Sequence, residues 1–189
     1  MSKRALYNPD NWLVYLRMPD TALLKLAEES RYKSTGKGGQ KKNKTENAVR
    51  LTLGDLLVTE SGTRSQATNR LGALKKLRLA IALDLTKGSE FRTLMSSPPE
   101  EIVPYLGTAE LRINPKNPVY SIYIGYLMDR YGAHFGELAP LAKELGYSRT
   151  QLTRFIERTP SLIGKLGELA GYIETLRFLK GSVPVEPEQ

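Results

Sequence analysis

Residues 33–50 read KSTGKGGQKKNKTENAVR, with Gly38-Gly39-Gln40 at the centre and lysines on both sides. Two adjacent glycines permit backbone conformations closed to other residues and let the chain approach another molecule closely. The flanking lysines, Lys37, Lys41, Lys42 and Lys44, favour a polyanion as that molecule. The apolar run at 48–53 has the composition of a strand. We therefore predict a basic loop anchored on a folded base; composition alone would favour a solvated lysine-rich linker.

Further groups flank the glycines at fixed spacing, and they make the pattern specific. These groups are Ser34-Thr35-Gly36, Asn43-Lys44-Thr45, Ala48-Val49-Arg50, Arg64-Ser65-Gln66 and Asn69-Arg70. Together with Gly38-Gly39-Gln40, they make residues 20–83 resemble the catalytic domain of class I peptide chain release factors and of the related ribosome-rescue peptidyl-tRNA hydrolases.

The resemblance implies hydrolysis of the ester that joins a nascent peptide to tRNA in the peptidyl-transferase centre. It implies that the backbone N–H of Gln40 stabilises the developing oxyanion, while its side chain positions water. Gly38 and Gly39 would supply the backbone conformation that aims this N–H. The partners implied are ribosomal RNA, peptidyl-tRNA and a Gln methyltransferase acting on Gln40, with no cofactor and no metal.

The basic and amide residues around the glycines are the candidate RNA contacts. For Gln66 and Asn69 two roles stay open, a bond to phosphate or a brace for the loop. Lys37, Lys41 and Lys42 replace residues that are usual in the family, and none of these changes removes a catalytic group. The candidate RNA-binding residues are Lys37, Lys41, Lys42, Asn43, Lys44, Arg50, Arg64, Ser65, Gln66, Asn69 and Arg70.

Charge is distributed unevenly along the chain. Residues 1–90 hold 17 Lys and Arg against 9 Asp and Glu, so this segment accounts for the whole net charge of +8. A basic balance confined to one segment favours a polyanionic partner there. The chain has no cysteine, which excludes a disulfide framework. With no apolar run of membrane-spanning length and no signal-peptide pattern, we expect a cytoplasmic monomer that contacts no membrane.

The first half of the chain alternates short elements. The run at 12–16 could be a strand or a docking segment, and 20–29 is predicted to be a helix capped by Asp20. A strand at 30–34 and a hairpin of 47–53 with 56–60, turning at Gly54-Asp55, come next. A long helix follows at 65–85, capped by Ser65. Its predicted buried stripe is Ala67, Leu71, Leu74, Leu77 and Ile81.

The second half of the chain is predicted to be a proline-rich linker followed by helices. Ile122, Ile124, Leu127, Met128 and Tyr131 suit one buried helix. Residues 138–156 resemble a helix-turn-helix, with Ala142, Gly146 and Leu152 at its spacing. A further helix at 161–178 would close the bundle. His134, the only histidine, is expected to be a surface or packing residue without a carboxylate partner.

The helix-turn-helix pattern allows two interpretations. Its second helix would be capped by Ser148 and would present Arg149, Gln151 and Arg154 as candidate nucleic-acid contacts. The favoured interpretation is a helical hairpin formed only for packing, because short motif matches carry false positives and this half is nearly neutral.

The predicted fold is α+β, with a small mixed or antiparallel sheet, a long helix and a projecting Gly-Gly-Gln loop, followed by an all-α bundle. The predicted domains are a catalytic domain at 1–90, a linker at 91–118, a helical domain at 119–180 and a disordered tail at 181–189. The predicted function is ribosome-dependent, codon-independent hydrolysis of peptidyl-tRNA. The alternative is a non-catalytic ribosome- or RNA-binding factor with an accessory helix-turn-helix, and a DNA-binding regulator is a third, less favoured hypothesis.

Overall fold

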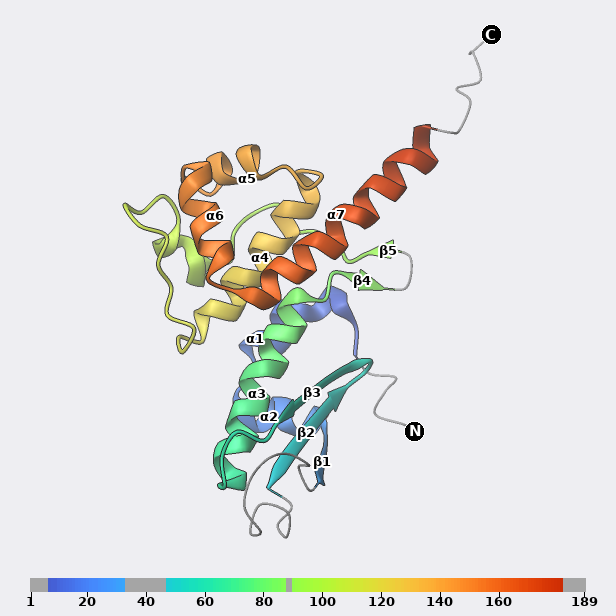
Figure 1. The fold of residues 1–189 in the computed structure, drawn as a ribbon, viewed down its shortest axis with the longest axis vertical. Coiled ribbons are helices and arrows are strands. Elements are labelled where there is room, and N and C mark those ends of the chain that lie inside the picture. Colours follow the sequence, from blue (N-terminus) through green and yellow to red (C-terminus); the bar gives the residue numbers. More distant parts are fainter. Residues whose placement is uncertain (1–6, 33–46, 88–89, 182–189) are drawn as a thin grey trace. The chain divides into compact units, whose positions relative to one another are not determined.

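The computed structural model describes residues 7–32, 47–87 and 90–181 (Figure 1). The glycine-containing loop at 33–46 lies outside these residues, as does the predicted tail beyond Gly181. The chain divides into two compact units, Met1–Thr93 and Leu94–Gln189. The first combines a three-stranded sheet with helices and the second is helical, so the predicted α+β class is confirmed.

The sheet of the first unit is antiparallel, in the order β1 (Glu28–Tyr32), β2 (Ala48–Leu53), β3 (Leu56–Glu60). Its hairpin turns at Gly54, whose φ of 58° is the left-handed conformation that glycine adopts without strain. The predicted hairpin is therefore confirmed. In β2 the buried side chains Val49, Leu51 and Leu53 alternate with Arg50 and Thr52, as expected for a sheet covered on one face.

Helix α3 (Gln66–Leu83) packs on β2 and β3 and covers that face (Figure 1). Ser65 caps it as predicted, because its Oγ accepts a hydrogen bond from the Thr68 N–H at 3.2 Å. The buried stripe is only partly as predicted: Leu74, Leu77 and Ile81 are buried, but Ala67 and Leu71 are exposed. Asn69 and Ala73 occupy the buried positions of the first turns instead.

Two short helices precede the sheet. The run at 12–16 is not a strand but the helix α1 (Trp12–Arg17), which follows the 3-10 helix η2 (Pro9–Asn11). Because α1 packs on α3, the run does dock on the rest of the unit, the second of the two roles predicted for it. Helix α2 (Asp20–Leu26) ends three residues earlier than predicted, because β1 begins at Glu28. Asp20 is not the cap but the first helical residue; the cap is Pro19, and the Asp20 carboxylate binds Arg78 at 2.8 Å.

The first unit ends with a small antiparallel pair, β4 (Thr86–Lys87) and β5 (Glu90–Phe91), followed by a buried arginine. Arg92 is 1% exposed and lies over the Trp12 indole, 4.5 Å from the ring centre. Its Nη1 donates to the Asp84 carbonyl at 2.9 Å, and its backbone N–H donates to the Leu85 carbonyl at 2.7 Å. Arg92, which lies in the stretch predicted to be a linker, therefore belongs to the core of the first unit.

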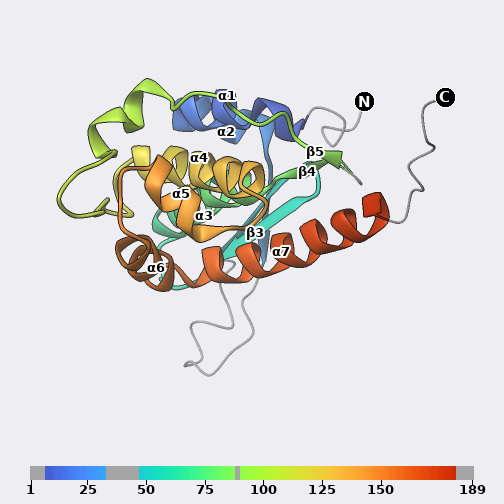
Figure 2. The same cartoon turned by 90° about the horizontal axis from the view of Figure 1, so that it is seen from above.

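The second unit contains η3 (Glu100–Tyr105), α4 (Val119–Ala133), α5 (Leu138–Glu144), α6 (Arg149–Glu157) and α7 (Pro160–Gly181) (Figure 2). The buried side predicted for α4 is confirmed, since Ile122, Ile124, Leu127, Met128 and Tyr131 are all buried. Part of the stretch expected as a linker joins this core, because Ile102, Leu111 and Ile113 are also buried. Across the described residues, every helix is either too short or too polar to cross a membrane.

The α5–α6 pair has the predicted helix-turn-helix features. Ala142 and Leu152 are buried, and Gly146 at the turn has a φ of 78°. A Cβ on Gly146 would lie 2.6 Å from the Cα of Gly107, so this turn accepts only glycine. The expectation that His134 has no carboxylate partner is wrong, because its Nε2 contacts Glu144, which also accepts two hydrogen bonds from Arg130.

Candidate functional site

The root of the glycine-containing loop is defined by two paired strand ends. The strand β1 ends at Tyr32, β2 begins at Ala48, and these two residues are register partners. Both ends of the loop are therefore fixed at the same end of the sheet. The predicted catalytic residues Gly38, Gly39 and Gln40 lie outside the described residues, as do Lys37, Lys41, Lys42, Asn43 and Lys44.

Asn69 fixes the point where the loop returns to the sheet. Its Nδ2 donates to the carbonyls of Asn47 and Thr63, both at 2.8 Å. Its Oδ1 accepts from the Thr63 N–H at 3.0 Å and from Thr63 Oγ1 at 2.9 Å. The side chain is completely buried and its hydrogen-bonding capacity is used. The predicted direct RNA contact of Asn69 is therefore corrected, because its buried side chain holds Asn47, next to the loop, and Thr63 instead.

A chain of polar contacts joins the edge strand β1 to the start of α3. Arg70 Nε binds Glu29 Oε2 at 2.7 Å, and Arg31 Nη2 lies 3.6 Å from Glu29 Oε1. The Gln66 amide, turned so that its oxygen faces the strand, accepts from the Arg31 guanidinium. Gln66 and Arg70 thus hold β1 against α3, and the half-exposed Arg70 keeps part of its guanidinium toward solvent.

The opposite face of the sheet carries Arg50. Its guanidinium lies over the Tyr32 ring, 5.1 Å from the ring centre, at the position where β1 enters the loop. Such a contact fixes the direction of a cation without neutralising its charge. Arg50, Arg64 and Ser65 are exposed, and Ser65 uses its Oγ as the cap of α3. Arg50 therefore contacts the root residue Tyr32, and all three predicted arginines, Arg50, Arg64 and Arg70, have exposed side chains.

Sequence reasoning missed two residues that shape this root, Thr63 and Glu60. Thr63 Oγ1 accepts from the Ser65 N–H at 3.2 Å and donates to Asn69, so it links the turn to the cap. A Thr two residues before a Ser cap is a signal for such side-chain turns. Glu60 accepts from the Gly62 N–H at 2.8 Å and the Ser61 N–H at 3.0 Å, and binds Lys76 at 3.0 Å.

These bonds hold the pKa of Glu60 below its ordinary value, chiefly through the Gly62 N–H and then through Lys76. The carboxylate is therefore charged at neutral pH and fixes the turn between β3 and α3. The hydrogen bonds of the loop root are thus formed within the chain, and the side chains of Arg50, Arg64 and Arg70 remain exposed. No three His, Asp or Glu side chains within the described ranges lie close enough to hold a metal ion.

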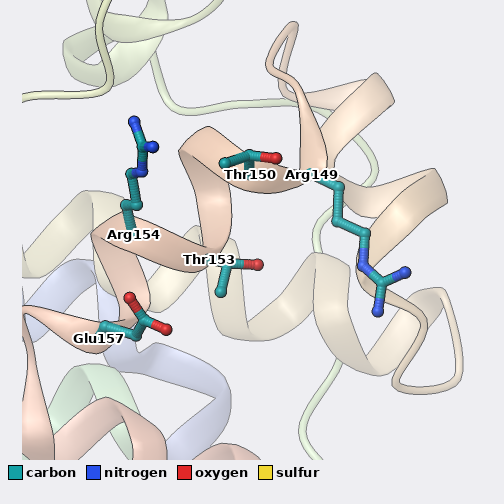
Figure 3. A pocket seen from close by; sticks show the side chains of 5 residues that line it. All are labelled: Arg149, Thr150, Thr153, Arg154 and Glu157. Carbon is teal, nitrogen blue, oxygen red and sulfur yellow. The ribbon is translucent and has the colours of Figure 1, made fainter.

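A second candidate surface lies on the outer side of α6 (Figure 3). Its side chains line an open groove of about 290 Å³; they are Arg149, Thr150, Thr153, Arg154 and Glu157. Arg149 and Arg154 are exposed as predicted. Gln151 is a correction, because its Oε1 accepts from the Ser148 N–H and its Nε2 donates to the Ala109 carbonyl, both at 2.9 Å. Both ends of that amide are engaged within the chain, which reduces its capacity to bind a base.

Comparison with known families agrees with the resemblance found in the sequence. Residues 24–96 match the family model of the RF-1 domain, the domain of class I release factors that contains the Gly-Gly-Gln motif. This segment covers the loop root and α3 of the first unit. No curated protein and no solved structure matches the chain. Factors with this domain act on the ribosome and on peptidyl-tRNA, which supports a release-factor-like role in general.

Proposed function

We propose that this protein is a ribosome-dependent, codon-independent peptidyl-tRNA hydrolase that acts in translation release or ribosome rescue. One observation carries the proposal: the segment that matches the RF-1 domain holds an intact Gly38-Gly39-Gln40 between two paired strand ends. A loop used only for binding would need its lysines but not this tripeptide. The braced root at Asn69 supports the same view, because a catalytic backbone group must be held in place.

In this proposal the backbone N–H of Gln40 donates to the oxyanion that forms as water attacks the ester carbonyl. Removing one such donor typically lowers a rate by about 10²–10³-fold. Gly38 and Gly39 allow the backbone to aim that N–H, and the Gln40 side chain positions the water. The chain needs no side-chain base in this scheme, no cofactor and no metal, since RNA groups of the ribosome share the proton transfers.

The cations around the loop would hold it in the peptidyl-transferase centre. Arg50, Arg64 and Arg70 at the described root, with Lys37, Lys41, Lys42, Asn43 and Lys44 of the loop, are proposed to contact RNA phosphates. Phosphate contacts position a protein but carry no sequence information. We therefore expect release to be independent of the codon in the A site. A cytoplasmic monomer whose Gln40 is methylated by a partner enzyme completes the proposal.

The test is release of labelled peptide from peptidyl-tRNA on ribosomes with an empty A site, comparing wild type with Gly39→Ala. Three messages are used: one ending at the P site, one with a stop codon in the A site and one with a sense codon. We expect release by the wild type on all three and release at least about a hundredfold slower by the variant. Binding without release on any message would contradict the proposal and leave an RNA-binding factor without hydrolytic activity.

A further inference from the structure

The exposed side of α6 gathers three arginines, and one acidic residue, Glu157, lies on the same side. Arg149 and Arg154 lie on this helix and Arg158 is its C-cap, and all three are exposed. Within the part of the chain that the structure describes, no carboxylate pairs with them. Other arginines of the second unit differ: Arg112 lies 3.6 Å from Glu110, and Arg130 lies 2.6 Å from Glu144.

The opposite side of α6 fixes which residues face outward. Leu152, Phe155 and Ile156 are buried, and the Phe155 ring meets Tyr123 edge-on at 5.5 Å. At 3.6 residues per turn, burial of these three positions turns the side formed by 149, 150, 153, 154 and 157 toward solvent. The Ser148–Gln151 capping box fixes the start of the helix. The outer face is therefore displayed by a well-anchored helix rather than by a loose one.

The arrangement of the side chains suits an extended anion. Figure 3 shows the Arg149 and Arg154 guanidinium groups reaching away from each other, with Thr150 and Thr153 between them. Five residues along a helix advance by about 7.5 Å, so the two cations serve separate points and not one small ion. Guanidinium groups bind phosphate with two parallel hydrogen bonds, and threonine hydroxyls donate a further one.

The same face favours RNA over DNA. A DNA-reading helix uses residues near its N-terminus to contact base edges in the major groove, and amides there suit adenine. Here the amide in that position, Gln151, is bound to Ser148 and Ala109. Glu157 on the outer face is an acceptor, which a phosphate repels but a ribose 2′-hydroxyl can satisfy as a donor.

We propose that the outer face of α6 binds the sugar–phosphate backbone of duplex RNA. Arg149 and Arg154 bind phosphates, Thr150 and Thr153 support them, and Glu157 accepts a hydrogen bond from a 2′-hydroxyl. That the natural target is ribosomal RNA rests on the proposed function; binding of an RNA duplex does not. The helical unit would then direct the first unit to RNA helices through their shape.

The test uses the full chain with Lys37, Lys41, Lys42 and Lys44 changed to Gln, so that the loop contributes little to RNA binding. The probes are a hairpin RNA with a stem of about 16 base pairs and a DNA hairpin of the same sequence. The test variant adds Arg149→Gln and Arg154→Gln. Its matched control adds Arg112→Gln and Lys165→Gln, which remove two exposed cations that already have acidic neighbours.

We expect the test variant to bind the RNA hairpin at least about tenfold more weakly and to make the negative slope of log K against log salt shallower by about 2. The control should change affinity less than about twofold. Glu157→Ala should reduce the preference for RNA over DNA. Circular dichroism should show all variants folded, since these side chains are exposed. Equal losses in test and control, or DNA bound as tightly as RNA, would overturn the proposal.

The outcome is separable from that of the proposed function, because the hairpin assay involves no hydrolysis. If the protein releases no peptide but the test variant binds RNA more weakly than the control, the RNA-binding surface is supported and only the catalytic proposal is contradicted. If the protein releases peptide but the test variant binds RNA as tightly as the control, only the proposed RNA-binding surface is contradicted.

Discussion

Some arginines of the first unit serve its own structure, whereas those on α6 of the second unit reach into solvent. In the first unit Arg78 donates to the Leu16 and Met18 carbonyls, both at 2.7 Å, and also binds Asp20, while Arg92 is buried against Trp12. In the second unit Arg149 and Arg154 reach into solvent from α6. The first unit, which holds the whole positive net charge, thus uses several cations for its own structure, whereas these two arginines of the nearly neutral unit form no ion pair among the described residues. Net charge along a sequence does not identify which cations are free for a partner.

The largest expected effect comes from removing the buried arginine. Arg92→Ala deletes the contact with Trp12 and leaves the Asp84 carbonyl without its donor. We expect a loss of about 4 kcal/mol in the free energy of unfolding of the first unit. Trp12 is the only tryptophan, so urea unfolding followed by its fluorescence reports this unit. Arg149→Ala should change the free energy of unfolding of either unit by no more than about 0.5 kcal/mol. Similar losses for both variants would contradict the contrast between the buried and the exposed arginine.

A pair of glycine substitutions tests the turn at Gly146 between α5 and α6, which holds α6 in place. Gly146→Ala combines a φ of 78° with a Cβ placed 2.6 Å from the Gly107 backbone. We expect it to cost about 3 kcal/mol in the second unit. Gly167→Ala in α7 meets nothing within 4 Å and should stabilise the helix by about 0.8 kcal/mol. Helical circular dichroism during urea unfolding measures both, and effects of the same sign would contradict the described turn.

The loop root of the first unit is tested by Asn69→Ala. This change leaves the Asn47 and Thr63 carbonyls without their buried donor. A loss of about 2 kcal/mol is expected in the Trp12 transition. If the brace positions the catalytic loop, peptide release should also fall by at least about tenfold under conditions where the variant is folded, with ribosome binding retained. An unchanged release rate would show that the root does not position the loop.

The smallest effect concerns the ion pair of Glu60. Its pKa is lowered in the folded chain, so the stabilisation is present above its ordinary value of 4.5 and is lost as pH falls through the folded value. The Lys76 side chain is 53% exposed and that of Glu60 23%, so solvent screens the pair and Glu60→Gln should cost under about 1 kcal/mol at pH 7. The difference between variant and wild type should shrink on acidification below pH 4.5. A difference that stays constant with pH would exclude the carboxylate charge as its cause.

Local sequence signals predicted much of the first unit. The Gly54-Asp55 turn and the Ser65 cap carry their own chemistry, and both lie where expected. Local signals gave wrong predictions where tertiary contacts determine the type of element or the burial of a residue. A five-residue apolar run does not distinguish a helix from a strand, so α1 was missed. Apolar periodicity does not identify a buried polar residue such as Asn69. It therefore predicted that Ala67 and Leu71 are buried in the first turns of α3, where both are exposed.

Long-range polar contacts were the other source of error. Arg92 lies in a proline-rich stretch whose composition predicts a linker, and only the fold brings it to Trp12. Gln151 has the sequence position of a recognition residue, and the fold engages its amide through the capping bond with Ser148 and the long-range bond to Ala109. Exposure of Arg149 and Arg154, in contrast, follows directly from the apolar positions of the same helix, and was predicted correctly.

The most direct test of the central claim, that the Gly-Gly-Gln loop hydrolyses peptidyl-tRNA, is the rate of peptide release measured over increasing protein concentration. Gly39→Ala should lower the maximal rate by about a hundredfold or more without changing the concentration for half-maximal release. The Arg149→Gln and Arg154→Gln double variant should raise that concentration and leave the maximal rate unchanged. Release by Gly39→Ala at the wild-type maximal rate would contradict the account.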